Sequence, residues 1–337
     1  MANKLTNSSS LAQINKLAYS IKYINMIKSS LIGLICCLFF AIPFATNAQE
    51  SALKLSTKVN ANKSVDFVAN KIDPGTYTVT LKFNNLSNAS SGNEEVVTVK
   101  NYSANAFTLS PINKDQSIGF SYSYSYIRGK LNPKFDKEFL YLLPYKAGTK
   151  VRVAESGFVN AAYFGSTTPD DWKCYRFYTE QADSITAVRK GVVVNVKDLY
   201  HTDEVTDVAY TSKINEVTIE HQDGTLAYYR GFKHGIKAKV GQIVFPGTVL
   251  GVNSKYSTGT SYGISLLMTY LKDKGIDDAK TKTLKDSKSR YGFITPHFFT
   301  AEQTNLILEP QKYYTVASTT EIIQKELTKK EIKALGQ

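Results

Sequence analysis

The feature that most constrains the fold is the alternation of polar and apolar residues in short segments. Residues 76–83 alternate without an exception. This pattern predicts a half-buried β-strand, because successive side chains of a strand point to opposite faces. Residues 95–100 and 117–127 also have strand composition, and loops rich in Asn, Ser and Gly separate them. We therefore expect a small antiparallel β-sandwich over about residues 51–136.

One of these predicted strands carries a stripe of tyrosines at every second position. Tyr122, Tyr124 and Tyr126 would all point to the same face of the strand. Two interpretations are open: the rings form a platform on which sugars stack, or they form the inward face of the strand. We favour the second, because a single aromatic face is an ordinary feature of a half-buried strand.

Strands continue beyond Phe139, where glycines mark the turns between apolar segments. These glycines are Gly191, Gly224, Gly241, Gly247 and Gly251. The only convincing helix is at the end of the chain, where residues 318–321 form a capping-box pattern and Gly336 is a stop signal. We expect a mainly β chain with one short C-terminal helix over residues 319–337.

The N-terminal segment predicts export. Residues 31–44 are apolar but fewer than the roughly 20 residues that a spanning helix needs. They have the length of a signal-peptide core, and small residues before Gln49 suggest cleavage there, with Met26 as the true start. A lipid anchor at Cys36 or Cys37 and a buried, non-secreted helix are the alternatives. We expect a mature chain without a transmembrane segment in the periplasm, at the cell surface or outside the cell.

Composition excludes several classes of protein. The chain has 41 Lys and Arg residues against 29 Asp and Glu residues, and the surplus is spread along the sequence. No basic run interleaved with aromatics predicts nucleic-acid binding, although the charge is compatible with anionic envelope polymers. Three cysteines are too few for a disulfide scaffold or a four-cysteine zinc site.

Several segments of the second half have glycine turns between apolar strands, at residues 141–148, 185–194, 215–225, 240–251 and 262–263. In their order and spacing they resemble the lysostaphin-type (LytM-like) zinc endopeptidases, which cut peptidoglycan cross-bridges. Each segment is a weak motif of glycine turns between apolar strands, but together they make a specific signal over about residues 139–315. The resemblance implies the family's compact antiparallel β fold, of the duplicated hybrid motif type.

The resemblance also implies a zinc site, and the sequence lacks its ligands. The family uses a His, an Asp and the second His of a His-x-His strand. Here Ser265 and Leu267 occupy the two histidine positions of that strand, and Arg176 or its neighbour Phe177 occupies the Asp position. The family's other catalytic histidine corresponds to Gly231. We therefore expect no zinc and no other cofactor.

The four histidines and Cys174 are the remaining side chains that could act as ligands or nucleophiles. His221 matches a family residue that does not bind zinc, and His297 lies beyond the catalytic strands. His234 is either an exposed turn residue or, after a loop shift, a neighbour of the groove. His201 lies in an acidic loop that is either solvated or holds a cation. Cys174 fits a buried free thiol better than a nucleophile.

The sequence thus predicts four segments: a leader and signal peptide (residues 1–48), an N-terminal sandwich (49–136), a degenerate peptidase domain (137–318) and a C-terminal helix (319–337). The family's groove would survive as a binding cleft. Its predicted floor consists of Arg176, Gly231, Ser265 and Leu267, and its predicted rim of Tyr229, Arg230 and Phe232.

Three functions remain open for such a protein. The first is a module that binds peptidoglycan or acts as an adaptor to another envelope protein. The second is an active cell-wall zinc endopeptidase with displaced ligands. The third is a structural envelope protein that binds nothing through the cleft.

Overall fold

The computed structural model describes residues 51–201, 213–255, 261–274 and 289–335, and β-strands dominate them. The predicted leader and signal peptide, residues 1–48, lie outside the described residues. Within the described part of the chain, no helix is long and apolar enough to span a membrane. The sheets are mainly antiparallel, as the alternating sequence predicts.

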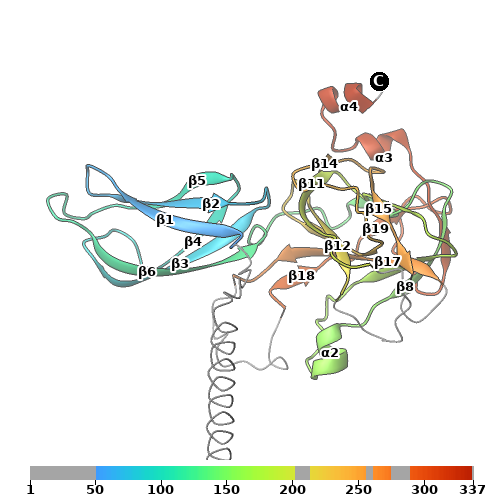
Figure 1. Ribbon diagram of the computed structural model, residues 1–337, viewed down its shortest axis with the longest axis horizontal. Helices are drawn as coiled ribbons and strands as arrows, with labels where there is room; N and C mark the ends of the chain where they lie inside the picture. Colours follow the sequence, from blue (N-terminus) through green and yellow to red (C-terminus); the bar gives the residue numbers. More distant parts are fainter. Residues whose placement is uncertain (1–50, 202–212, 256–260, 275–288, 336–337) are drawn as a thin grey trace, which may run out of the picture. The chain divides into compact units, whose positions relative to one another are not determined.

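The N-terminal half consists of two three-stranded antiparallel sheets, drawn in blue to green in Figure 1. The first sheet has the order β1 (Leu53–Val59), β2 (Val65–Lys71) and β5 (Ser103–Leu109). The second has the order β4 (Glu94–Val99), β3 (Tyr77–Ser87) and β6 (Gly119–Arg128). This arrangement is the small sandwich that the sequence predicts.

The inner faces of the two sheets share a core around Phe67. Phe67 is fully buried, and its ring centroid lies 5.1 Å from that of Tyr122. The Tyr124 hydroxyl accepts a hydrogen bond from the Leu55 backbone N–H at 3.3 Å, and Tyr126 packs against the same core. The tyrosine stripe of β6 is therefore the inward face of a strand, and its rings are used in packing.

The second half is built around one large sheet, whose strands follow the order β14-β11-β12-β13-β17-β9-β8-β20. Their bounds are β8 (Lys150–Glu155), β9 (Tyr175–Thr179), β11 (Gly191–Lys197), β12 (Asn215–Glu220), β13 (Leu226–Phe232), β14 (Ile243–Val244), β17 (Tyr262–Leu271) and β20 (Tyr313–Thr315). Two short strands, β16 (Ser254–Lys255) and β18 (Tyr291–Phe293), also pair with β17.

Two small strand pairs complete the second half. Strand β10 (Ser184–Thr186) pairs antiparallel with β15 (Val249–Val252), and β19 (His297–Phe299) pairs parallel with β7 (Leu140–Leu142). A single hydrophobic cluster connects these pairs to one face of the large sheet, with Phe177, Tyr229 and Phe298 among its fully buried members. The opposite face of the central strands carries both polar and apolar side chains, among them Arg230, Ser265 and Leu267.

The helices differ in number from the prediction. The C-terminal segment, red in Figure 1, forms α3 (Thr320–Gln324) and α4 (Lys329–Leu335) instead of one helix. Thr319 is the N-cap of α3. The capping pattern predicted at residues 318–321 is thus displaced by one residue, because the cap is Thr319 and its side chain accepts from the Ile322 N–H. A capping box does begin α4, because Thr328 and Glu331 exchange hydrogen bonds at its start. A further short helix, α2 (Val159–Phe164), precedes β9.

The two halves have separate hydrophobic cores that share no residue. The chain between them is anchored to the large sheet, because the Asn132 backbone N–H donates to the Leu271 carbonyl at 2.8 Å. A domain boundary near residue 136 agrees with this division of the core and stays a prediction.

We expect limited trypsin digestion of the whole chain to cut after Lys130, Lys134 or Lys137 and to leave two stable fragments. The three lysine side chains are exposed, and each half retains its own core when the connection is cut. Mass spectrometry of the digest identifies the cutting sites. Cuts confined to the far ends of the chain would contradict a boundary in this stretch.

Candidate functional site

The resemblance places the candidate site on β17. Ser265 of β17 pairs with Arg230 of β13 on one side and with Arg176 of β9 on the other. Directly opposed residues of antiparallel strands point to the same face, with Cβ atoms about 4.5–5.5 Å apart. The side chains of Arg176, Ser265 and Arg230 therefore form one row, which we call the arginine face. All three residues are partly or fully exposed.

Leu267 lies two residues further along β17, so it shares this face with Ser265. It is opposite Tyr228 of β13, and both residues are half-buried. The structure thus brings together four of the residues that the sequence assigns to the cleft: Arg176, Arg230, Ser265 and Leu267. Both positions of the His-x-His pattern point to the same side, as the resemblance implies.

Two residues of the predicted rim lie elsewhere. Tyr229 and Phe232 are both 0% exposed, and the Tyr229 hydroxyl accepts a hydrogen bond from the Val188 N–H at 2.9 Å within the core. Tyr229 points inward because it is next to Arg230 on a strand of period two. Phe232 points inward because the pairing of β12 and β13 shifts register at its partner, Asn215. Neither residue can therefore line a cleft on the arginine face.

Gly231 is the residue at which β13 departs from regular alternation. Its φ of 110° lies in the region that L-residues rarely adopt. A Cβ at this position would be 3.2 Å from the Gly263 carbonyl oxygen. A histidine at the family's position would consequently be strained by the backbone, whatever space its ring found.

Glu216 of β12 supplies an acidic group to the arginine face. Arg230 forms an ion pair with Glu216 of β12, and its guanidinium carbon lies 5.7 Å from the centroid of the Tyr228 ring. Glu216 is not among the residues predicted from the sequence to line the cleft. The hairpin turn at residues 221–225 could have revealed it, because the turn sets the register that places Glu216 opposite Arg230. Together, Arg176, Arg230 and Glu216 carry a surplus of positive charge.

Cys174 precedes β9 and is a buried free thiol, as the sequence predicts. Burial raises the pKa of the thiol, so the nucleophilic thiolate is disfavoured at neutral pH. Phe177, the other residue considered for the family's Asp position, is also fully buried. Arg176 is therefore the residue of that pair that reaches the exposed face.

The four histidines do not gather around the arginine face. His221 is 2% exposed, and its Nδ1 lies 2.7 Å from the Lys190 carbonyl oxygen. His297 contacts Asn305 at 2.7 Å. His201 and His234 lie together, with ring centroids 4.4 Å apart, and Nδ1 of His234 is 3.1 Å from Oδ1 of Asp198. The sequence gives no sign that His201 and His234 lie together, because their proximity depends on the tertiary fold.

The residues at the family's ligand positions do not fit a catalytic zinc ion. Such a site takes three ligands from His, Asp, Glu or Cys and leaves one position for water. Ser265, Leu267, Arg176 and Gly231 offer no imidazole or carboxylate. Among the described residues, no group of three or more His, Cys, Asp or Glu side chains could hold a metal ion.

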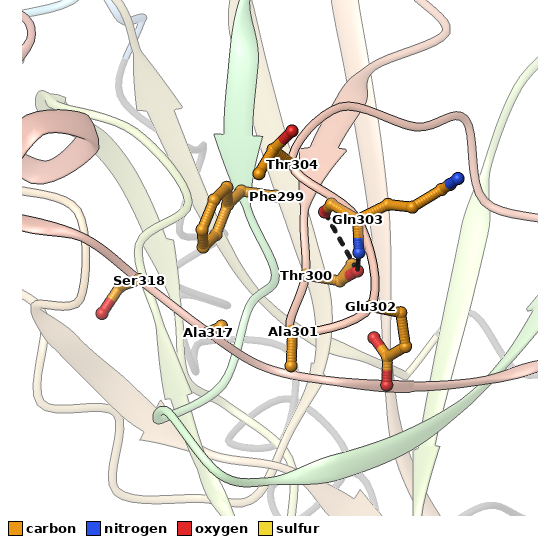
Figure 2. Close-up of a pocket in the computed structure, with 8 residues that line it drawn as sticks. All are labelled: Phe299, Thr300, Ala301, Glu302, Gln303, Thr304, Ala317 and Ser318. Carbon is orange, nitrogen blue, oxygen red and sulfur yellow. Dashed lines mark hydrogen bonds between the residues drawn. The ribbon is translucent and has the colours of Figure 1, made fainter.

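The structure also has a pocket of about 520 Å³, whose lining residues are not those at the family's ligand positions (Figure 2). Its lining residues are Phe299, Thr300, Ala301, Glu302, Gln303, Thr304, Ala317 and Ser318. Thr300 accepts a hydrogen bond from the Gln303 N–H at 3.1 Å, which shapes the loop after β19. None of the residues predicted for the cleft lines this pocket.

Solved structures similar to this chain include three peptidases. The M23 metalloprotease pseudoalterin from the deep sea is 13% identical, and the match covers 54% of this chain and 96% of that one, with a TM-score of 0.30. A putative M23 peptidase from Pseudomonas aeruginosa is 14% identical over 57% of this chain and 82% of that one, with a TM-score of 0.23. A zinc-containing peptidase from Vibrio cholerae is 12% identical over 64% and 75%, with a TM-score of 0.24.

The sequence comparisons give no match. No family model matches the chain, and no curated protein matches it. Two of the three similar structures are described as M23 peptidases and the third as a zinc-containing peptidase.

Proposed function

We propose that this chain is an exported envelope protein whose peptidase-like half binds peptidoglycan, or another envelope partner, without hydrolysing it. The observation that carries the proposal is the arginine face. Where the family places an Asp and two His residues, this chain has Arg176, Ser265 and Leu267, and a second arginine, Arg230, lies opposite Ser265.

The chemistry of this face disfavours a metal ion. Hydrolysis of a peptide bond by this family's mechanism needs zinc to lower the pKa of water from about 15.7 to about 7. When a fixed positive charge lies about 4 Å from a dication, their repulsion raises the electrostatic energy by several kcal/mol, even at an effective dielectric constant of about 20. Arg176 would supply that charge at the position where the family has a carboxylate.

The same face suits an anionic ligand. A guanidinium group presents parallel N–H donors that match the two oxygens of a carboxylate. Arg176 and Arg230 approach Ser265 from opposite sides, so the carboxylate of a peptidoglycan stem peptide could contact both. Such contacts fix a peptide without activating its amide bonds, which supports binding without cleavage.

We expect the Arg176→Ala variant to bind peptidoglycan about 10- to 100-fold more weakly than the wild-type protein, because a hydrogen bond to a charged group contributes about 1.5–3 kcal/mol. Pull-down with purified sacculi measures the change. Titration with soluble muropeptides can follow the fluorescence of Trp172, the only tryptophan, which precedes the strand that carries Arg176.

The matched control is Arg290→Ala, which removes an exposed arginine outside the arginine face and should leave binding unchanged. Equal binding by the wild type and the Arg176→Ala variant would contradict the assignment of the face. If the wild-type protein does not bind sacculi, the result would favour the third function, a structural envelope protein that binds nothing through the cleft.

Metal analysis distinguishes this proposal from the alternative that the chain is an active zinc endopeptidase with displaced ligands. We expect less than stoichiometric zinc in the purified mature protein, and a chelator should change neither binding nor the unfolding temperature. About one zinc ion per chain, together with chelator-sensitive release of muropeptides, would establish displaced ligands and overturn the proposal.

A further inference from the structure

A second row of side chains lies beside the arginine face, on the three strands at one end of the large sheet. Tyr313 of β20 pairs with Arg152 of β8, and Arg152 pairs with Tyr178 of β9. Because opposed residues of antiparallel strands point to the same face, these three side chains form a row, which we call the tyrosine row. Tyr178 lies two residues after Arg176 on β9, so the tyrosine row is on the same side of the sheet as the arginine face.

The tyrosine row is part of the molecular surface. Tyr313 is 58% exposed, whereas the next residue, Tyr314, is buried. Arg152 and Tyr178 are partly exposed, and both chain neighbours of each are buried. The tyrosines of β6 differ, because their rings pack against the core of the sandwich. The rings of the tyrosine row are therefore accessible to a ligand.

Two cations lie against the rings of this row. The guanidinium carbon of Arg152 is 4.5 Å from the centroid of the Tyr178 ring, and Nζ of Lys150 is 5.3 Å from that of the Tyr313 ring. Arg152 also donates a hydrogen bond from Nη1 to Oε1 of Gln311 at 2.9 Å, which sets the direction of its guanidinium group. A cation at this distance is attracted to the ring and restrains it. A ligand that packs on restrained rings loses less affinity to the ordering of side chains.

Exposed tyrosine rings beside hydrogen-bond donors suit a carbohydrate. The face of an aromatic ring is electronegative, so the polarised C–H groups of a sugar pack favourably on it. Arginine and lysine side chains donate hydrogen bonds, which the hydroxyl and acetamido oxygens of a sugar can accept. Neighbouring strands lie about 4.8 Å apart, close to the length of one unit in a β-1,4-linked sugar chain. A row with one side chain on each strand can therefore contact successive sugars.

The position of the tyrosine row next to the arginine face favours one polymer, the glycan strand of peptidoglycan. Residues two apart on a strand are separated by about 6.6 Å, which is the spacing between Tyr178 and Arg176. A stem peptide branches sideways from its glycan strand. A strand that follows the tyrosine row would therefore direct the carboxylates of the stem peptide towards Arg176. The positive charges of Lys150, Arg152 and Arg176 complement those carboxylates.

We infer that the tyrosine row is a carbohydrate subsite that binds a β-1,4-linked chain of N-acetylated sugars, in this protein the glycan strand of peptidoglycan. Tyr313 and Tyr178 supply the stacking surfaces, and Arg152 supplies hydrogen-bond donors between them. The choice of peptidoglycan as the polymer rests on the proposed function. The contact between sugar and tyrosine does not depend on a carboxylate at the arginine face.

The test uses chitohexaose, a β-1,4-linked hexamer of N-acetylglucosamine that has no stem peptide and no carboxylate. We expect the purified protein to bind it, and Tyr313→Ala to bind it about 3- to 10-fold more weakly, the range for the loss of one aromatic contact. Tyr313→Phe should bind as the wild type does, because the ring and not the hydroxyl makes the contact. Isothermal titration calorimetry measures the affinities.

The matched control is Tyr102→Ala, which removes a tyrosine of the sandwich that is 53% exposed and should leave the affinity unchanged. Tyr178→Ala provides a second variant within the row and should weaken binding in the same range as Tyr313→Ala. The unfolding midpoint shows that each variant is folded. Replacement of the exposed Tyr313 should shift that midpoint little.

The outcomes distinguish this inference from the proposed function. Binding to sacculi without binding to chitohexaose would overturn the inference and leave the proposed function intact. Equal binding of chitohexaose by the wild type and both tyrosine-to-alanine variants would also overturn it, because the sugar would then lie elsewhere. Tyrosine-dependent binding of chitohexaose without binding to sacculi would support the carbohydrate subsite and contradict the proposed function.

A single-stranded nucleic acid is the other polymer that stacks on aromatic rings beside cations. The export proposed for this protein separates it from such a ligand. An oligothymidylate added to the same titration tests the point. Tighter binding of the oligothymidylate than of chitohexaose would assign the row to nucleic acid and overturn the inference.

Discussion

Replacement of Arg189 by methionine should lower the free energy of unfolding by about 3–5 kcal/mol, the cost of removing one partner from a buried ion pair. The Arg189 side chain is 5% exposed and lies 2.7 Å from Asp223 and 2.6 Å from Glu326. Burial of the Asp223 carboxyl group opposes its ionisation. The positive charge of Arg189 nevertheless holds the pKa of Asp223 below its usual range. The substitution leaves two carboxylates without their counter-charge, and urea denaturation measures the loss.

Two variants make this result specific. Adding Asp223→Asn and Glu326→Gln to Arg189→Met should restore part of the stability, because the unpaired charges are then absent. Lys312→Met removes the partner of the exposed Glu309 and should leave the unfolding midpoint unchanged. A loss below about 1 kcal/mol in Arg189→Met would show that the C-terminal segment, which carries Glu326, contributes little to folding.

The second large effect concerns acid stability and depends on His221. Its Nδ1 donates to the Lys190 carbonyl, an assignment that follows because a carbonyl can only accept. Its Nε2 is buried without a hydrogen-bond partner among the described residues. Burial, together with the charge of Arg189, lowers the pKa of His221 to about 4.

The sign of the pH dependence follows from this lowered pKa. The unfolded chain binds a proton at His221 near pH 6.5, whereas the folded chain binds it only near pH 4. The contribution of His221 to the free energy of unfolding therefore has its full value above pH 6.5. It falls by about 3 kcal/mol as the pH drops to about 4, since each unit of pKa difference corresponds to 1.36 kcal/mol. Urea denaturation at pH 7, 6, 5 and 4 measures the decline.

Asparagine at position 221 provides the test variant. Its amide N–H can replace the Nδ1–H donor to Lys190 without adding a titrating group. The stability of His221→Asn should therefore change much less between pH 6.5 and 4 than that of the wild type. His234→Asn, at an exposed histidine, should retain the wild-type decline. An equal decline in both variants would assign the acid sensitivity to other groups.

The regular strands could be predicted from the sequence because burial of one face imposes a period of two. Residues 76–83 and 117–127 correspond closely to β3 and β6, and Ser265 and Leu267 lie on the same face of β17. The same period, combined with the family's order of motifs, brought Arg176 and Arg230 to one side of the sheet.

The exceptions arise where local backbone geometry overrides the period. Phe232 turns into the core because the chain bulges at Gly231, and a bulge leaves no mark on the hydrophobic pattern except the glycine itself. Helix α2 has six residues, too few to show a helical period. The capping box from Thr328 to Glu331 marks the break between the two C-terminal helices and is not among the helix signals predicted from the sequence.

Other features depend on contacts between distant parts of the chain. Tyr291 meets the Arg128 carbonyl across a sequence separation of 163 residues, and no local pattern encodes that meeting. His201 and His234 come together for the same reason. Such pairs follow from the packing of loops and strand ends, whereas periodicity describes only the regular part of each strand.

The conformation of Gly231 has a consequence for the zinc site that the resemblance implies. Restoring histidines at positions 265 and 267 would need only side-chain replacements, because both positions already point to the correct side. Position 231 is different, since its φ of 110° and the nearby Gly263 carbonyl exclude an unstrained side chain. An imidazole at position 231 would require the main chain to move before the side chain could be unstrained. Placing all of the family's histidines on this chain would therefore take a change of backbone conformation at position 231 as well as side-chain replacements.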